Sequence, residues 1–388
     1  MAERSLIFPA AEYRGRTARL QQGMEAQGLD ALLLTAAADV FYVTGFLTRF
    51  WESPARPWFV VVPRSGDPVA VIPAIGADLM GRTWMPVIRT WEAPDPFDDG
   101  ISLLTETLAG LVPERGRVGL PMGLETHLRM PLADFETLRS SLAPRAFVDA
   151  TACVQRVREI KSDAEIAKVR EACAIGARAF ARVPQFAAEG RPLDAVFRDF
   201  QVALLEAGAD WVSYVAGGAG PDGYGDVISS AGPEQLARGE VLMLDTGAVK
   251  DGYFCDFDRN FAIGRATDAA RRAHAALWQA TEDVVKLLRP GLRACDVHRL
   301  LRDALSRHGA TVSRGRLGHG LGVALTEWPS FTPRDETPLR AGMVLSLEPC
   351  CETGDGRIMV HEENLVLRED GAELLSPRAE ADLPVVGR

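Results

Sequence analysis

Two pairs of candidate β-strands, each carrying acidic side chains that face one another, constrain the fold of this chain most strongly. The first pair spans residues 240–248 and 253–263, and the second spans residues 343–349 and 357–367. Paired antiparallel strands hold opposing Cβ atoms roughly 5 Å apart. Like charges at that separation repel one another unless protonation or a cation offsets them. The fold must therefore supply such compensation, and a divalent metal is the obvious cation.

The register of the first pair decides which acids meet. If residues whose numbers sum to 501 face each other, Asp245 lies opposite Asp256. A two-residue turn at Asp251 and Gly252 instead places Asp245 opposite Asp258. Asp256 and Asp258 share one strand face because side chains alternate along a strand. Both registers bring carboxylates together, and the residues alone leave the choice open.

The second pair repeats this pattern. Glu348 and Glu362 face each other if paired residues sum to 710, which centres the hairpin on Asp355. Gly354 and Gly356 flank that residue, a composition typical of a turn. Two such hairpins in one domain are harder to explain as ordinary strand-end acids than one alone.

His319, flanked by glycines in the segment LGHGLG, is the fifth candidate. The glycines permit unusual backbone angles and leave the imidazole accessible. Carboxylates with one imidazole suit Mn, Fe, Co or Zn. Two such ions, roughly 3.5–4 Å apart, share carboxylates and activate a bridging water in known sites. Taken singly, each residue is more often a turn, cap or core residue, so the hypothesis depends on their joint occurrence.

The organisation along the chain predicts two domains. Residues 1–155 read as an α/β domain with strands at 29–35, 40–46, 58–62 and 69–72, the last two forming a hairpin. Residues 156–388 read as a catalytic domain whose helices and antiparallel strands segregate, an α+β fold. Ser162 and Glu165 have capping-box spacing and predict a helix from residue 163.

Composition excludes several partners. The formal net charge is −10 with acidic and basic residues mixed, so no basic surface for nucleic acid is expected. No signal peptide and no uncharged apolar run of about 18 residues occurs, which predicts no membrane span. The six cysteines form no CxxC pair and indicate reduced thiols in the cytoplasm. Cys350 and Cys351 are interpreted as structural thiols rather than ligands of a soft metal.

The ordered motifs LMLDTG, DFDRNF, GHGLG, SLEP and HEENLV resemble the creatinase / aminopeptidase P / prolidase family, which has the "pita-bread" fold. VREIKSDAEIAKVREA resembles the start of its catalytic domain, and FYVTGF resembles part of its N-terminal domain. The resemblance implies two divalent metal ions and a homodimer whose N-terminal domain helps to close the partner's pocket. Carried over by motif, it implies these metal ligands: Asp245, Asp256, His319, Glu348 and Glu362. It makes Asp258 and Glu363 bystanders, although Asp258 lies close enough in sequence to touch the site.

The chain departs from the family pattern at both helper histidines. Family peptidases carry a His about seventeen residues before the first metal Asp, whereas no His occurs here between residues 127 and 274. Tyr224 and Asp226 lie near that place and are candidate replacements. Thr326 replaces the second helper, seven residues after His319. A threonine donates a hydrogen bond but carries no charged proton. Cys350 also stands where the family usually has glycine after Glu-Pro.

The resemblance leads to a metal-dependent hydrolase of an amide or other C–N bond in a small polar or dipeptide-like substrate. Glu348 is the candidate general base beside the activated water, and Thr326 is the second candidate catalytic residue. Xaa-Pro dipeptide cleavage and small-metabolite hydrolysis (ectoine-type ring opening) are both open, because both helper histidines are missing. The alternatives are elimination, as in dimethylsulfoniopropionate lyases of this fold, and a non-catalytic binding protein.

Overall fold

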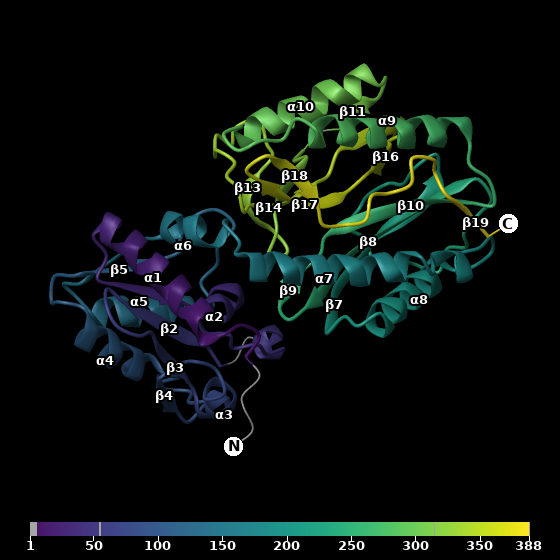
Figure 1. Ribbon diagram of the computed structural model, residues 1–388. Helices are drawn as coiled ribbons and strands as arrows, with labels where there is room; N and C mark the ends of the chain where they lie inside the picture. Colours follow the sequence, from purple (N-terminus) through teal and green to yellow (C-terminus); the bar gives the residue numbers. More distant parts are fainter. Residues whose placement is uncertain (1–5, 54–55, 314, 388) are drawn as a thin grey trace. The chain divides into compact units, whose positions relative to one another are not determined.

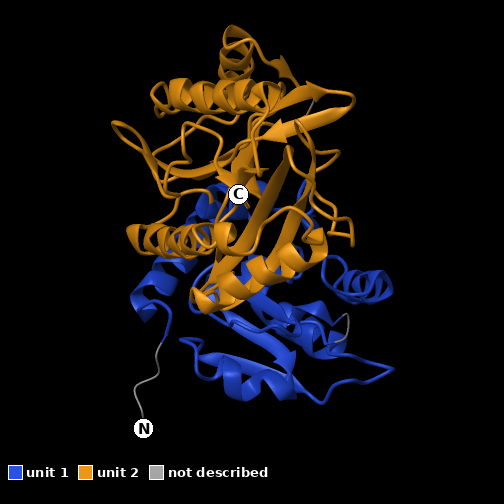
Figure 2. Cartoon of the chain, turned by 90° about the vertical axis from the view of Figure 1, so that its right-hand side faces the viewer, with its two compact units in different colours: residues 1–158 blue, residues 159–388 orange. Residues whose placement is uncertain are grey.

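The chain divides into two compact units, residues 1–158 and 159–388 (Figure 2). The computed structural model describes residues 6–53, 56–313 and 315–387. Within these ranges no helix has the length and apolar character needed to cross a membrane. Each unit has its own hydrophobic core, so each is described by itself.

The N-terminal unit is built on a six-stranded mixed sheet with the order β4-β3-β2-β1-β5-β6. The strands are β1 (Ala31–Leu34), β2 (Phe59–Pro63), β3 (Val69–Pro73), β4 (Val87–Trp91), β5 (Arg117–Leu120) and β6 (Ala146–Asp149). β2 pairs antiparallel with β3, which confirms the predicted hairpin. The three central strands β1, β2 and β3 are buried along their whole length, as their unbroken apolar runs require.

Helices and short 3-10 turns surround this sheet. They are α1 (Ala10–Gln27), α2 (Ala37–Thr44), η1 (Phe50–Glu52), η2 (Ala74–Gly76), α3 (Ala77–Met80), α4 (Ile101–Leu111), α5 (Leu132–Ser141) and α6 (Thr151–Arg158). α4 contributes Leu104 and Leu108 to the core beneath the sheet.

The predicted strand at residues 40–46 is wrong, because this segment lies in helix α2. Val40, Tyr42 and Val43 are all buried, so the helix has no exposed polar face. The sequence therefore lacks the alternation of apolar and polar residues from which a helix is recognised. A short apolar run of this kind fits a buried strand and a buried helix equally well. Gly45 has φ 76° and ends the helix, and the Thr44 hydroxyl donates to the Val40 carbonyl at 2.6 Å.

The C-terminal unit places strands between two pairs of helices (Figure 1). The helices are α7 (Asp163–Phe180), η3 (Val183–Gln185), α8 (Leu193–Glu206), α9 (Asp268–Val285) and α10 (Ala294–Arg307). α7 packs on β8 and α8 on β7, whereas α9 packs on β15 and β16. α7 begins with the predicted capping box between Ser162 and Glu165. The predicted segregation of helices and antiparallel strands is confirmed.

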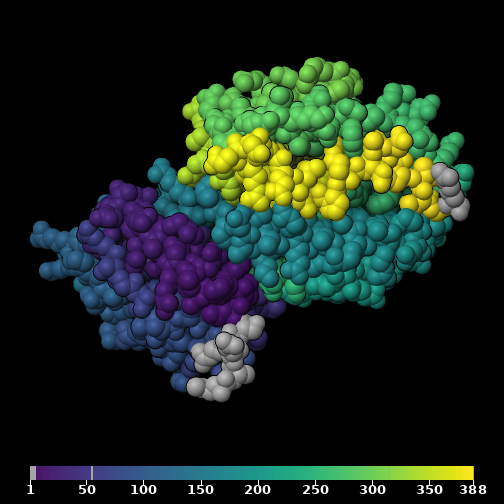
Figure 3. All heavy atoms as spheres, in the orientation of Figure 1, coloured from purple at the N-terminus to yellow at the C-terminus, as the bar shows by residue number. Residues whose placement is uncertain are grey.

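Three sheets make up the strand layer of this unit. Their orders are β19-β10-β8-β7 with β9 on β8, β13-β12-β14-β17-β18, and β11-β15-β16. The strands are β7 (Trp211–Pro221), β8 (Glu240–Lys250), β9 (Tyr253–Phe254), β10 (Phe257–Ile263), β11 (Thr311–Val312), β12 (Gly318–Gly320), β13 (Glu327–Ser330), β14 (Val344–Leu347), β15 (Cys350–Gly354), β16 (Arg357–Val360), β17 (Glu363–Arg368), β18 (Gly371–Leu374) and β19 (Val385–Val386). In Figure 3 the yellow C-terminal segment covers the seam between the green and teal helices of this unit.

The first acidic hairpin adopts the register in which paired residues sum to 503. Asp245 pairs with Asp258, and Lys250 pairs with Tyr253. Asp251 and Gly252 form the two-residue turn with φ 50° and 80°. Two positive φ angles define a turn whose twist matches that of the flanking strands. The 501 register, with Asp245 directly opposite Asp256, does not occur.

The second acidic hairpin has the predicted sum of 710. This register holds between β15 and β16, where Cys351 pairs with Met359, and between β14 and β17, where Leu347 pairs with Glu363. Glu348 and Glu362 lie at the junction between these two ladders, at the ends of β14 and β17. They therefore lie at a break in the strands, where both line the same cavity.

Candidate metal centre

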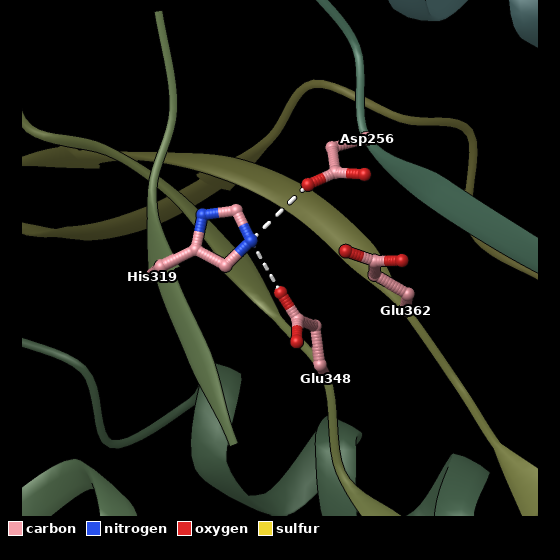
Figure 4. A group of neighbouring side chains, drawn as sticks. All are labelled: Asp256, His319, Glu348 and Glu362. Carbon is pink, nitrogen blue, oxygen red and sulfur yellow. Dashed lines mark ion pairs between the residues drawn. The ribbon is translucent and has the colours of Figure 1, made fainter. Parts of the chain in front are cut away.

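Four of the five predicted ligands converge on one point of the C-terminal unit. Ligand atoms of Asp256, His319, Glu348 and Glu362 lie within 4.8 Å of one another. His319 Nε2 is 3.1 Å from Asp256 Oδ2 and 2.5 Å from Glu348 Oε1. Figure 4 shows the imidazole between these two carboxylates, with Glu362 facing the same space. Three carboxylates and one imidazole form a donor set that suits a divalent first-row metal.

The fifth predicted ligand, Asp245, adjoins this group through a tyrosine. The Tyr214 hydroxyl lies 3.0 Å from Asp245 Oδ1 and also hydrogen-bonds Asp256 Oδ1. Both aspartates line the same cavity as His319 and Glu348. The structure thus places all five predicted residues around one cavity, four in direct proximity and Asp245 linked to them through the Tyr214 hydroxyl.

Asp256 reaches the site because the strand is interrupted there. Residues 255 and 256 fall between β9 and β10 and belong to neither strand. The Asn364 side chain takes the place of a strand partner: its Oδ1 accepts from the Asp256 N–H at 2.9 Å, and its Nδ2 donates to the Asp256 carbonyl. Asp256 thus lies outside regular strand pairing, whereas Asp258 lies within β10 and pairs with Asp245. Only Asp256 enters the four-residue group.

Glycines place His319 between two neighbouring strands. A Cβ atom at Gly318 would lie 2.3 Å from the Ser346 carbonyl oxygen, and one at Gly320 would lie 2.0 Å from the Trp328 carbonyl oxygen. The His319 Nδ1 is 2.7 Å from the Gly320 carbonyl, which only accepts, so Nδ1 carries the hydrogen. Nε2 is therefore the nitrogen directed at the carboxylates, as expected for a metal-ligating histidine with its other nitrogen held by the backbone.

The electrostatics of the group also favour a cation. Burial raises the pKa of Asp245 and Glu362 well above their usual values, and the surrounding carboxylates raise them further. Burial by itself would lower the pKa of His319, but Glu348 and Asp256 outweigh it and raise that pKa to about 10. Buried like charges resist ionisation when no cation compensates them. A divalent metal removes this conflict, so the residues fit the group they are predicted to hold.

The neighbouring acids have other partners. Glu363 accepts from Arg259 Nη2 at 3.0 Å and from Arg378 Nη1 at 2.9 Å, which neutralises its charge away from the cavity. Asp258 is fully buried and accepts from Asn260 Nδ2 at 3.0 Å, and its other oxygen has no hydrogen-bond partner. Burial raises the pKa of Asp258 to about 8. Neither acid belongs to the four-residue group.

The cavity over the metal centre has a volume of about 650 Å³. Thr326 and Cys350 line it, together with apolar walls from both hairpins. Val227 and Ile228 occupy the place expected for the missing upstream histidine. The two residues suggested as its replacements serve the backbone instead: the Tyr224 hydroxyl accepts from the Val360 N–H at 2.6 Å, and Asp226 Oδ1 accepts from the N–H groups at 228 and 229.

The sequence argument missed Tyr214. It lies in β7, an unpredicted strand, at a bulge where the pairing with β8 shifts between Val212 and Val215. A bulge re-aims the side chain it carries. A Cβ atom at Gly247 would lie 2.4 Å from Tyr214 Cε1, so that glycine admits the ring against β8. Gly247 lies inside a strand, two residues after Asp245. A glycine at such a position indicates that another part of the chain approaches the strand closely, and the sequence contained this signal.

Two family models match the chain. The model described as "Metallopeptidase family M24" matches residues 167–370. The model described as "Creatinase/Prolidase N-terminal domain" matches residues 16–160. The first match covers more than half of the chain and contains all five predicted ligands.

Relatives match over nearly the whole length. "Probable dipeptidase PepE" of Mycobacterium tuberculosis is 28% identical over 94% of this chain and 94% of its own. "Xaa-Pro dipeptidase" of Pyrococcus horikoshii is 23% identical over 91% of this chain and 94% of its own. The crystal structure of dipeptidase PepE from Mycobacterium ulcerans has a TM-score of 0.84 at 29% identity and covers 98% of this chain and 100% of that chain. A prolidase structure from Thermococcus sibiricus has a TM-score of 0.85 at 22% identity, with coverage of 96% and 99%, and shows the same fold.

These matches confirm the predicted fold class, in which a creatinase-type N-terminal domain precedes a pita-bread catalytic domain. Family membership implies divalent metal ions, and the carboxylate–imidazole group offers them a site. The chain therefore belongs to metallopeptidase family M24, and it is a metal-dependent hydrolase of the prolidase type.

Proposed function

We propose that this protein is a dinuclear-metal dipeptidase that cleaves an Xaa-Pro or similar dipeptide. The supporting observation is the group of Asp256, His319, Glu348 and Glu362 around one point, with Asp245 linked to it by Tyr214. Four carboxylates provide the charge needed to balance two divalent ions. The dipeptidase names of relatives that span nearly the whole chain support the substrate class.

The cavity suits a small substrate with an apolar side chain. Its volume of about 650 Å³ is within the range of small-molecule sites. Its walls include these apolar side chains: Val215, Val227, Ile228, Met243, Leu325, Ile358 and Val360. A short peptide with an apolar first residue fits such a site better than a charged one does.

Each polar residue has an assigned role in the proposal. The five ligands would hold two ions of Mn, Fe, Co or Zn, which supply a polarised carbonyl and a water of lowered pKa. Glu348 is the general base, because its side chain lines the cavity and is 21% exposed, whereas Asp256 is 6% exposed and Glu362 is buried. The Thr326 hydroxyl donates a hydrogen bond to the carbonyl oxygen as negative charge develops on it.

A second candidate function is hydrolysis of a small-metabolite amide. It is favoured by one observation: the cavity presents Thr326 and Ile228 where the family's peptidases carry histidines. Neither side chain supplies a charged proton. This lining is compatible with a substrate whose leaving nitrogen needs no proton from a side chain at these two positions.

Metal stoichiometry and a substrate panel test the proposal. Purified protein is loaded separately with Mn, Fe, Co and Zn, and bound metal is counted by mass spectrometry. We expect two ions per chain and release of proline from Ala-Pro and Leu-Pro, with sedimentation showing a homodimer. Saturation at one ion would refute the dinuclear site. Loaded protein that cleaves small cyclic or acylated amides but no dipeptide would establish the second function.

A further inference from the structure

We propose that the buried ion pair between Lys161 and Glu327 is a positioning device that fixes the Thr326 loop at the metal cavity. The inference rests on the proposed role of Thr326 as a hydrogen-bond donor to substrate. Lys161 Nζ lies 2.9 Å from Glu327 Oε2, and the side chains are 2% and 1% exposed. Both charges are thus withdrawn from water and lie within ion-pair distance of each other.

The lysine end of the pair is held by the backbone around it. The Lys161 N–H donates to the Gly342 carbonyl at 2.9 Å, and Ser162 then caps helix α7. Gly342 has φ 88°, and a Cβ atom there would lie 2.9 Å from Ile160 Cγ2. The ammonium group therefore projects from a segment with little freedom to move.

The glutamate end closes the loop that leads to the cavity. Its Oε1 accepts from the Ala324 N–H at 3.1 Å. A Cβ atom at Gly322 would lie 2.9 Å from both carboxylate oxygens and from Lys161 Cε, so the loop packs directly on the ion pair. The Gly322 carbonyl in turn accepts from the Phe254 N–H at 3.0 Å, on the hairpin that carries Asp256.

This loop connects a metal ligand to the candidate hydrogen-bond donor. Glu327 begins β13 and pairs with Gly320 of β12, next to His319. Thr326 and Leu325 precede Glu327 and line the cavity. Glu327 is therefore buried against Lys161, while its neighbour Thr326 lines the substrate space.

A buried ion pair is a poor means of stabilising a fold, because desolvation offsets its attraction. Apolar residues of similar volume commonly replace such pairs without loss of stability. The pair does fix a direction, since the carboxylate has to face both the ammonium group and the Ala324 N–H. We therefore assign it a role in placing the loop rather than in stabilising the unit.

A double-mutant cycle separates positioning from stability. Thr326→Val and Glu327→Gln are each compared with the double variant in the metal-loaded full chain. If the pair acts through Thr326, each single variant lowers kcat about 10-fold or more, and the double variant resembles Thr326→Val alone. KM and bound metal stay near their wild-type values. Multiplicative losses in the double variant would overturn the proposal.

Two further variants guard against misfolding. Lys161→Met with Glu327→Met replaces the pair by apolar side chains, and we expect it to fold with metal bound but with kcat still reduced. Wild-type kcat in this variant would overturn the proposal. The matched control is Lys168→Met, which removes an ion pair with Asp251 in the same unit whose side chains are 25% and 28% exposed, and it is expected to leave kcat unchanged.

A readout without substrate keeps this inference separate from the proposed function. Amide hydrogen exchange at Ala324 should accelerate in Glu327→Gln, because its acceptor is weakened, whereas Lys168→Met should not change it. Unchanged exchange in Glu327→Gln would overturn the loop assignment. If wild-type protein cleaves no dipeptide or amide, the proposed function fails, and exchange at Ala324 still decides whether the pair holds the loop.

Discussion

The Tyr214 hydroxyl bonds both Asp245 and Asp256, so a single phenol orients two predicted ligands. Burial and the adjacent aspartates raise the pKa of Tyr214 well above its usual value, which keeps the hydroxyl protonated as a donor. Second-layer groups of this kind typically change metal affinity about 10- to 100-fold when removed. At the scale of single residues, the candidate metal centre therefore extends beyond its predicted ligands.

Tyr214→Phe should retain the fold and weaken metal binding about 10- to 100-fold. The ring keeps its place against Gly247, and only the hydrogen bonds to the aspartates are lost. The control is Tyr253→Phe, which removes a buried hydroxyl bonded to Glu165 at 3.0 Å. It should cost about 1 kcal/mol of unfolding free energy and leave metal affinity unchanged. Titration with Mn measures both affinities, and equal values for the two variants would contradict this role of Tyr214.

Asp256→Asn and Asp258→Asn should separate a ligand from its neighbour. Asp256→Asn removes a carboxylate from the four-residue group, so activity should fall by at least about 100-fold with loss of bound metal. Asp258→Asn should keep its metal, because Asp258 lies outside that group. Metal content per chain distinguishes the two variants. Loss of metal in Asp258→Asn alone would show that the ligand has been assigned to the wrong aspartate.

At the scale of elements, hairpin registers decide which side chains meet. The turn at Asp251 and Gly252 aligns Asp245 with Asp258, and the interruption at residue 256 then directs Asp256 into the site. Asn364 holds that interruption open with hydrogen bonds to both backbone groups of Asp256. In the second hairpin, Glu348 and Glu362 lie where the β14–β17 ladder meets the β15–β16 ladder. Both hairpins therefore place ligands where regular pairing stops.

Gly252→Ala should destabilise the first hairpin by about 1 kcal/mol, because a side chain at positive φ is strained. Gly252 has φ 80°. Gly225→Ala is the control in the same unit: a Cβ atom there meets nothing within 4 Å, and its φ is not in the left-handed region. Its unfolding free energy should change by less than about 0.5 kcal/mol. Urea unfolding followed by far-ultraviolet circular dichroism measures the difference.

At the scale of the whole molecule, the C-terminal segment closes the second unit by reaching back to α9 and β10. The ring N–H of His274 donates to the Glu380 carbonyl at 2.9 Å, Trp278 Nε1 donates to the Ala379 carbonyl at 2.9 Å, and β19 pairs with β10. Burial lowers the pKa of His274, and it lowers that of His361 well below the usual value. Both imidazoles are therefore held neutral in the folded chain.

Acid should destabilise the protein through these histidines. The unfolded chain binds protons as pH falls below about 6.5, whereas the folded chain binds fewer, so unfolding free energy decreases by up to about 1.4 kcal/mol per pH unit for each such histidine. His274→Phe should flatten this dependence between pH 7 and 5. His127→Gln, which changes an exposed histidine, should leave it as in the wild type. Identical slopes in the two variants would show that His274 does not contribute.

The sequence by itself predicted the residues of the candidate metal centre and the pairing of the second hairpin. Turn glycines and strand alternation act between near neighbours, so the sum of 710 followed from the printed residues. The order of the motifs then indicated the family, which the matches confirm. Helix boundaries with a local cap, such as Ser162, were equally accessible.

Only the tertiary structure decided the features that depend on distant segments. The sequence did not reveal that α2 is a helix, because residues on all its sides are buried and show no helical period. The backbone of Asp256 is held by the Asn364 side chain, 108 residues away along the chain. Tyr214 enters the site through a bulge opposite Gly247. In each case the direction of a side chain is fixed by a contact with another strand or helix, and such contacts exist only after the chain has folded.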